Sequence, residues 1–332
     1  MSDHQTVQLA ELVSALSYAL DLTEGQPVGH SVRACWISIA IGTELGMNAT
    51  ELTDLYYTAL LKDVGCTSNA ARVCQLYVTD DINFKRKAKF LDHSAPQFLR
   101  YLIENAGMKQ NLVARFRLII DTALQTGVIS HELTDTRCHR GADIAREMRF
   151  SEAVAQGITD LDEHWNGKGL PRKKVGAEIS LNSRIALLAQ VTDVFFMSEG
   201  PEAALAEVKR RSGTWFDPAL VALLEKVGAD KQFWRALSDP MLQQRVVAYQ
   251  TVKDSRPVNE EYLDDIASAF ANVIDTKTPY TSGHSDRVAL FSDLIAVQFG
   301  LPDAHRRHLR RAALLHDIGK LGVSNSTLDK PG

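Results

Sequence analysis

The sequence predicts an all-α protein in which one helical pattern occurs twice. Apolar residues recur at steps of three and four, as from Leu9 through Leu12 and Leu16 to Leu20, and this spacing is typical of helices with one buried face. Alternation of Val, Ile and Thr, which favours strands, is scarce. Near residues 170–181 we expect at most a short strand or hairpin, with residues 178–181 as its candidate.

A repeat with a constant offset supports the duplication. Gly-His-Ser-x-Arg at residues 29–33 recurs at residues 283–287. Ala-Leu-Leu-Lys-Asp-Val-Gly-Cys at residues 59–66 recurs at 313–320 as Ala-Leu-Leu-His-Asp-Ile-Gly-Lys. Both matches have an offset of 254 residues, without a gap between them. A constant offset indicates duplication of a structural unit.

The helices follow from local patterns in chain order. An apolar stripe over residues 288–299 ends at Gly300, which suits a helix C-terminus. Gly and Pro make residues 166–171 a loop. Further helical patterns are found at residues 9–20, 37–45, 183–197, 202–211, 218–227 and 231–250.

These patterns divide the chain into three parts. Residues 1–250 form the first copy, residues 251–257 a linker around Asp-Ser-Arg-Pro, and residues 258–332 the second copy. Because the second copy is much shorter than the first, we expect it to be the N-terminal part of a domain that is cut off partway.

Composition excludes several classes of protein. Charged residues make up 23% of the 332 residues, and the formal net charge of −4 gives no reason to expect nucleic-acid binding. No apolar run approaches the roughly 18 residues of a membrane-spanning helix, and no secretion signal precedes the first helix. Four cysteines without CxxC spacing suit reduced thiols. We therefore expect a cytoplasmic protein without a membrane partner.

The second copy carries residues suited to metal-assisted phosphate chemistry. His316 and Asp317 are adjacent, and His284 precedes them by 32 residues. Imidazole and carboxylate groups bind divalent ions, and one carboxylate can bridge two of them. Lys320 lies four residues after His316, where its charge could stabilise a phosphate oxygen. The first copy has Lys62 in place of the second histidine.

With these motifs the second copy resembles the HD-GYP phosphodiesterases, a subgroup of the HD superfamily of metal-dependent phosphohydrolases. The similarity covers residues 262–332 closely. It implies an HD-domain helical bundle, metal ligands at His284, His316 and Asp317, and catalytic roles for Asp317 and Lys320. Some members use a Glu for a third metal where this chain has Tyr280, so the resemblance implies two ions, iron or manganese.

The first copy resembles the same subgroup in degenerate form. Lys62 and Arg137 place cationic groups where a divalent ion should bind, and like charges repel strongly at low dielectric. We therefore expect no catalytic metal in the first copy, which would be regulatory or would mediate a homodimer. The remnants of its site are His30, Lys62, Asp63, Arg137, Asp162 and Asp193.

The resemblance implies a bacterial signalling enzyme, a cyclic dinucleotide phosphodiesterase. Its substrate would be cyclic di-GMP or cyclic GMP-AMP, whose 3′–5′ phosphodiester a metal-activated hydroxide hydrolyses. Because the second copy holds only part of the ligand set, we expect weak metal binding and turnover from this chain alone. Two alternatives stay open: a non-catalytic HD-type sensor or scaffold, and an enzyme acting on a nucleoside triphosphate or a ppGpp-like alarmone. The sequence identifies no substrate-binding residues.

Overall fold

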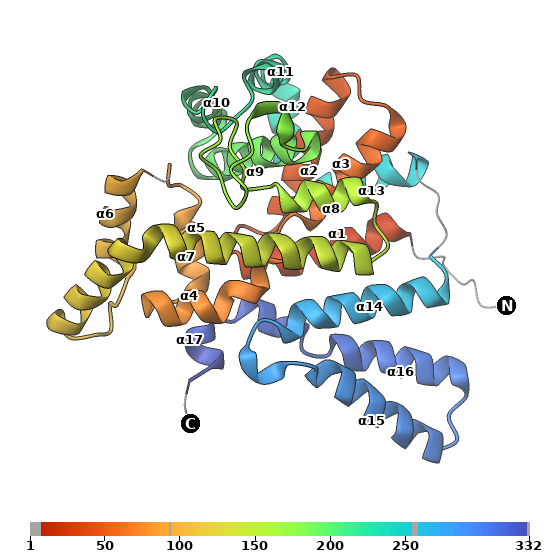
Figure 1. Cartoon of the computed structure of the whole chain (residues 1–332). Helices are drawn as coiled ribbons and strands as arrows, with labels where there is room; N and C mark the ends of the chain where they lie inside the picture. Colours follow the sequence, from red (N-terminus) through yellow and green to blue (C-terminus); the bar gives the residue numbers. More distant parts are fainter. Residues whose placement is uncertain (1–7, 93, 254–257, 331–332) are drawn as a thin grey trace.

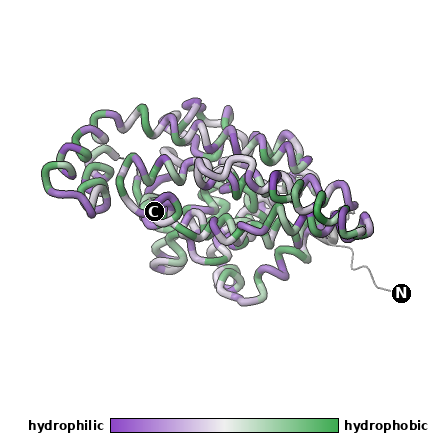
Figure 2. Tube along the Cα trace, turned by 90° about the horizontal axis from the view of Figure 1, so that it is seen from below, coloured by the Kyte–Doolittle hydropathy of each residue, from purple (hydrophilic) through white to green (hydrophobic). Residues whose placement is uncertain are grey.

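The computed structural model describes residues 8–92, 94–253 and 258–330. All regular structure in these ranges is helical, with isolated bridges between Asn166 and Val175 and between Ser212 and Phe216. The predicted all-α class is confirmed. In Figure 2 hydrophobic and hydrophilic residues alternate along the helices, as expected where one face of each helix is buried.

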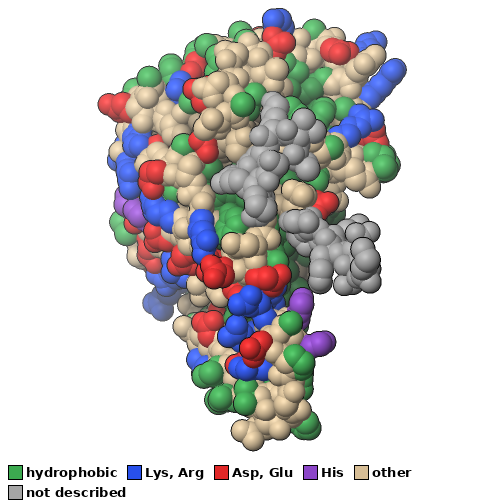
Figure 3. All heavy atoms as spheres, turned by 90° about the vertical axis from the view of Figure 1, so that its right-hand side faces the viewer, with side chains coloured by type: hydrophobic (Ala, Val, Ile, Leu, Met, Phe, Trp, Pro, Cys, Tyr) green, Lys and Arg blue, Asp and Glu red, His purple; other side chains and the backbone are tan. Residues whose placement is uncertain are grey.

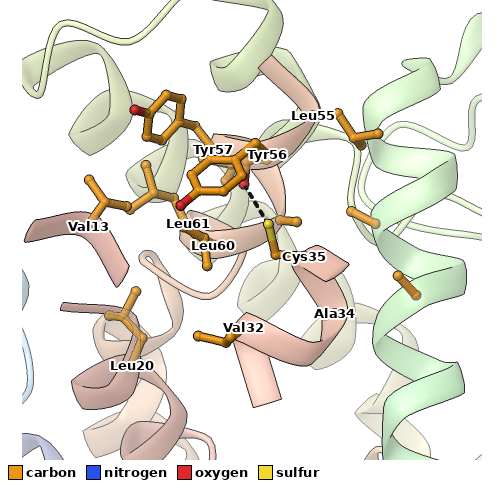
Figure 4. Packing of buried hydrophobic residues seen from close by; sticks show 14 of the residues in the cluster. Val13, Leu20, Val32, Ala34, Cys35, Leu55, Tyr56, Tyr57, Leu60 and Leu61 are labelled. Atoms are coloured by element: carbon orange, nitrogen blue, oxygen red, sulfur yellow. Dashed lines mark hydrogen bonds between the residues drawn. The ribbon is translucent and has the colours of Figure 1, made fainter. Parts of the chain in front are cut away.

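The first copy is a bundle in which helix α2 is central. It packs against α1, α3 and α9, and Figure 4 shows Val13 and Leu20, Val32 and Cys35, and Leu60 drawn from α1, α2 and α3 respectively. The longest helix, α7, crosses this bundle beside α8 (Figure 1). The helices are α1 (Leu9–Thr23), α2 (His30–Glu44), α3 (Ala49–Leu61), η1 (Cys66–Asn69), α4 (Ala70–Tyr77), α5 (Asp81–Ala88), α6 (Ala95–Asn105), α7 (Leu112–Glu147), α8 (Glu152–Thr159), η2 (Gly176–Glu178), α9 (Leu181–Glu199), α10 (Pro201–Arg210), α11 (Pro218–Gly228), α12 (Lys231–Leu237) and α13 (Leu242–Lys253).

The second copy repeats α1, α2, α3 and η1 of this bundle as α14, α15, α16 and η4. Helices α14, α15 and α16 form a layer below α7, coloured blue in Figure 1. The elements are α14 (Glu260–Asp275), η3 (Pro279–Thr281), α15 (His284–Gln298), α16 (Asp303–Leu315), η4 (Ile318–Gly322) and α17 (Asn325–Leu328).

Matching hydrogen bonds confirm the repeat at atomic detail. Asp21 accepts from the backbone N–H of Ser31 at 3.0 Å and from its hydroxyl at 2.7 Å. Asp275 accepts from Ser285 at the same two distances. In both copies a glycine with positive φ, Gly29 or Gly283, precedes the first helical histidine, a backbone conformation that favours glycine.

The two copies share a hydrophobic core. Ile266, Phe270 and Ile274 of α14 and Leu321 of η4 are all buried in the cluster formed by α1, α2, α3 and α9. Tyr262 also donates from its hydroxyl to the backbone carbonyl of Met148 at 3.0 Å. The division at residues 250 and 258 stays a prediction, and the shared core shows that the second copy is firmly attached to the first.

Three local predictions are corrected. Residues 178–181 form no strand: Gly176–Glu178 is a 3₁₀ turn and α9 begins at Leu181. The helix expected over residues 231–250 is broken into α12 and α13 at Asp239-Pro240, because proline cannot continue the helix. Residues 251–253 of the expected linker continue α13, and residues 254–257 lie outside the described residues.

One face of α15 is strongly apolar and exposed. Phe291 and Ile295 are 59% and 57% exposed, whereas Ile37 and Ile41, their equivalents in the repeat, are fully buried. In the first copy α9 and α11 pack against α2, and the described part of the second copy has no corresponding helices. Figure 3 shows hydrophobic side chains at the lower end of the molecule, where Figure 1 places α15.

Candidate metal centre

The second copy brings its predicted ligands together. His284 is the first residue of α15, and His316 and Asp317 follow the last turn of α16. The centroids of the two imidazole rings are 5.4 Å apart. Nε2 of His284 lies 3.5 Å from Oδ2 of Asp317, and Nε2 of His316 lies 3.2 Å from the same oxygen. The three side chains thus face one point, and we call them the candidate metal centre.

The ligand atoms of this centre suit a divalent ion. One atom from each side chain lies within 4.8 Å of the other two. Nδ1 of His316 lies 2.7 Å from the backbone carbonyl of Ala313. Because a carbonyl only accepts, Nδ1 carries the proton in the neutral ring and Nε2 keeps its lone pair for a metal. The side chains are between 18% and 38% exposed, so an ion and a ligand can reach them.

Lys320 also faces the centre. Its ammonium group donates to Oδ2 of Asp317 at 2.6 Å, from the short helix η4. This oxygen therefore has a cationic partner in the structure. An ammonium group at this position can stabilise a negatively charged ligand bound at the centre.

Buried ion pairs occupy the equivalent place in the first copy. His30 lies 2.7 Å from Asp193 through Nδ1, and Arg33 donates to the other carboxylate oxygen at 2.6 Å. Burial raises the pKa of Asp193, but the hydrogen bond and charge of His30 and the guanidinium group of Arg33 outweigh it and hold the pKa below its usual value. Its cationic partner is therefore Arg33, while His30, whose pKa is lowered by burial and by Lys62, supplies a hydrogen bond.

Two further remnants have the same kind of partner. Lys62 donates to Asp63, and Lys89 lies 3.3 Å from the second oxygen of that carboxylate. Arg137 donates to Asp162 through Nε at 2.7 Å. Lys62 thus lies against the retained carboxylate of Asp63, and Arg137 against Asp162, which stands where the resemblance implies a histidine.

A second group of possible ligands lies in the first copy. Glu24, Asp63 and Cys66 have ligand atoms within 4.8 Å of one another, all buried. Lys85 and Lys89 both pair with Glu24, at 3.3 Å. Burial, with the neighbouring carboxylates, raises the pKa of the Cys66 thiol to about 12, so the thiol stays protonated. This group is better suited to internal ion pairing than to a metal.

Sequence reasoning missed the part that helix α5 takes in this arrangement. Lys85 and Lys89 were not among the candidate residues, nor was Asp81. Asp81, Lys85 and Lys89 are spaced four residues apart, and this spacing predicts that they lie on one side of a helix. The spacing does not show which part of the molecule that side contacts.

Comparisons with known proteins decide the family. Two family models, each described as an HD domain, match residues 123–220 and residues 281–332. The "3'3'-cGAMP-specific phosphodiesterase 3" of Vibrio cholerae is 51% identical over 327 residues, which cover 98% of this chain and 71% of the relative. The chain belongs to the HD superfamily of phosphohydrolases. The resemblance found in the sequence is thereby confirmed.

Other HD-domain relatives are more distant. The "3'3'-cGAMP-specific phosphodiesterase 1" of Vibrio cholerae is 26% identical over 79% of this chain and 64% of its own length. A "Cyclic di-GMP phosphodiesterase response regulator" of Xanthomonas campestris is 36% identical over 30% of this chain and 24% of its own length.

A solved structure has the same fold. The crystal structure of a cyclic GMP-AMP specific phosphodiesterase from Vibrio cholerae matches with a TM-score of 0.74 and 47% identity, over 98% of this chain and 73% of that one. In the described part of this HD-superfamily chain, no helix has the length and apolar character needed to cross a bilayer.

Proposed function

We propose that this protein is a metal-dependent cyclic dinucleotide phosphodiesterase whose active site is built on the second copy. The observation that carries the proposal is the convergence of His284, His316 and Asp317 on one point, in a member of the HD superfamily. The relative at 51% identity is specific for 3′3′-cGAMP by its name, which favours that substrate over cyclic di-GMP. The substrate would lose one 3′–5′ phosphodiester bond to water.

The residues present fit a divalent cation. Two imidazole nitrogens and a carboxylate oxygen are compatible with iron or manganese, so His284, His316 and Asp317 would hold the ion or ions. A bound divalent metal would supply an activated water and stabilisation of negative charge. Lys320, which lies beside Asp317, would donate to a phosphate oxygen and orient the substrate.

The first copy has another role in this proposal. Its retained carboxylates, Asp63 and Asp193, are paired with Lys62 and Lys89 and with Arg33, and these positive charges oppose the binding of a cation at the same carboxylates. We propose that the first copy regulates the second or mediates a homodimer through its surface. Light scattering of the purified chain would test the dimer.

Metal titration tests the proposed centre. We expect wild-type protein to bind Mn²⁺ weakly in calorimetry, because only part of the ligand set is present, and His316→Ala or Asp317→Ala to lower the affinity at least about tenfold further, because each variant removes one ligand. His308→Ala is a matched control, since this exposed imidazole on α16 also has Nδ1 against a backbone carbonyl, that of Ala304 at 2.8 Å. It should leave the affinity unchanged.

Turnover of 3′3′-cGAMP, followed by chromatography of the linear product, tests the activity. Equal Mn²⁺ binding by wild type and His316→Ala would contradict the proposed centre. We expect slow hydrolysis by this chain, because it holds only part of the ligand set. Mn²⁺ binding with no hydrolysis of any cyclic dinucleotide above the metal-free rate would instead favour a sensor or scaffold.

A further inference from the structure

A buried carboxylate of the first copy holds the second copy beside its candidate metal centre. Asp81, the first residue of α5, accepts from the ammonium group of Lys277 at 2.9 Å. Its other oxygen accepts from the hydroxyl of Ser324 at 2.8 Å and from the backbone N–H of Asn325 at 2.7 Å. The side chains of Asp81 and Lys277 are both completely buried. A charge in such a place needs its partner, because water cannot replace it.

The network continues from Asp81 into the second copy. The side-chain amide of Asn325 donates to the carbonyl of Lys277 at 2.8 Å and to Asp329 at 2.7 Å. Thr278 donates to the other oxygen of Asp329 at 2.5 Å. Two segments far apart in sequence, residues 277–278 and 324–329, are thus tied together through one carboxylate of the first copy.

These two segments flank the candidate metal centre along the chain. Lys277 precedes His284 by seven residues, and Ser324 follows Lys320 by four. Between Lys320 and Ser324, Leu321 is fully buried in the core of the first copy. The backbone that carries the centre is therefore anchored on both sides, and each anchor rests on the first copy.

The network is not part of the repeated pattern. At the offset of 254 residues, Lys277 corresponds to Thr23, and Ser324 and Asn325 correspond to Ala70 and Ala71. Thr23 lacks a charge, and the two alanines lack side-chain donors. The donors that meet Asp81 occur only in the second copy, so they serve its contact with α5 rather than the shared fold.

Helix α5 also reaches the equivalent place in the first copy. Lys85 and Lys89, one and two turns after Asp81, pair with Glu24, and Lys89 pairs with Asp63 as well. One side of this short helix therefore contacts the first copy's ion pairs and the anchors of the candidate metal centre.

We propose that Asp81 is a positioning residue for the candidate metal centre, through which α5 of the first copy fixes the segments that carry His284, Asp317 and Lys320. The metal part of this inference rests on the proposed function, whereas the anchoring of the two segments does not. The first copy thereby contributes to the site without a ligand of its own.

Hydrogen exchange of the full chain tests the anchoring. In Asp81→Asn we expect amides in residues 276–284 and 318–326 to exchange on the order of tenfold faster or more, because their local opening becomes easier. Amides of α11, which Figure 1 places at the opposite end of the molecule from α17, should be unchanged. Asp80→Asn is the matched control: it removes the same charge one residue away, and asparagine can still cap α5 at its bond with Asn83.

Mn²⁺ affinity of the same proteins tests the positioning. We expect Asp81→Asn to weaken binding on the order of tenfold at an unchanged circular dichroism spectrum, a readout that a purely structural contact would not move. Ser324→Ala, which leaves the buried ion pair intact, should cause a smaller loss in the same direction. This variant keeps the test usable if Asp81→Asn folds poorly.

The outcomes are separable. Unchanged exchange in both segments of Asp81→Asn overturns the inference, and so does faster exchange with unaltered Mn²⁺ affinity. If wild-type protein binds no Mn²⁺, the proposed function fails, and the exchange experiment alone decides whether Asp81 anchors the two segments.

Discussion

Adding a methyl group at Gly65 of the first copy should destabilise the protein, whereas adding one at Gly319, its equivalent in the second copy, should not. Gly65 follows Asp63 and packs against α7: a Cβ there would lie 2.0 Å from the carbonyl oxygen of Arg137 and 2.7 Å from the backbone nitrogen of Gly141. The backbone of Gly65 has φ −85° and ψ −8°, which alanine adopts readily. Gly65→Ala therefore tests steric contact and not backbone strain.

The magnitude follows from the missing space. Carbon and oxygen atoms in contact are separated by about 3.3–3.5 Å, so α7 and this turn would have to separate by more than about 1 Å. Both contacted atoms belong to backbone, which cannot move aside as a side chain can. Overpacking of this kind costs about 1–3 kcal/mol, reduced by about 0.4–1 kcal/mol because alanine restricts the unfolded chain. We expect a net loss of about 1.5 kcal/mol.

Gly319→Ala is the matched control. Gly319 occupies the same position of the repeat, and a Cβ there would have nothing within 4 Å. We expect its free energy of unfolding to change by less than about 0.5 kcal/mol. Urea unfolding followed by circular dichroism would measure both variants. With an unfolding entropy of about 0.7 kcal/mol/K for a chain of 332 residues, the expected loss for Gly65→Ala corresponds to about 2 °C in Tm. Equal stability of the two variants would refute the reasoning.

Three further predictions concern charged residues. Asp193→Asn should lower the free energy of unfolding by about 3–5 kcal/mol, because it leaves a buried guanidinium group unpaired. Asp143→Asn, which removes an exposed ion pair, should lower the free energy of unfolding by less than about 1 kcal/mol. Similar urea midpoints for Asp193→Asn and Asp143→Asn would contradict the importance of the buried pair. Burial raises the pKa of Glu24, but two lysines outweigh it and hold the value at about 2. The lowered pKa of Glu24 contributes up to about 3 kcal/mol to the free energy of unfolding; this contribution is complete above pH 4.5 and is lost as pH falls toward 2. Glu24→Gln should therefore make the free energy of unfolding depend less on pH in this acidic range. Parallel stability curves for wild type and Glu24→Gln would contradict this role of Glu24. Lys320→Ala should keep or raise Mn²⁺ affinity while weakening 3′3′-cGAMP binding, and a loss of Mn²⁺ affinity as large as that of His316→Ala would show that the lysine supports the metal instead.

Much of the candidate metal centre was predictable because its signals are local. The offset between His30 and His284 and the adjacent pair at His316 and Asp317 were enough to name the candidate ligands. Both histidines lie at helix ends, and helix ends follow from apolar periodicity and from Gly283. The break at Asp239-Pro240 is equally local, because proline stops the helix although apolar residues continue on both sides of it.

The sequence by itself determined the helical class, the duplication and the identity of three metal-site candidates, since these depend on spacing within short segments and on a fixed offset. Only the tertiary structure decided which cations neutralise the first copy's carboxylates and which residue anchors the second copy. Asp193 meets His30 across 163 residues, and Asp81 meets Lys277 across 196. Such pairs depend on how helices that are distant in sequence pack together, and no pattern of neighbouring residues specifies that packing.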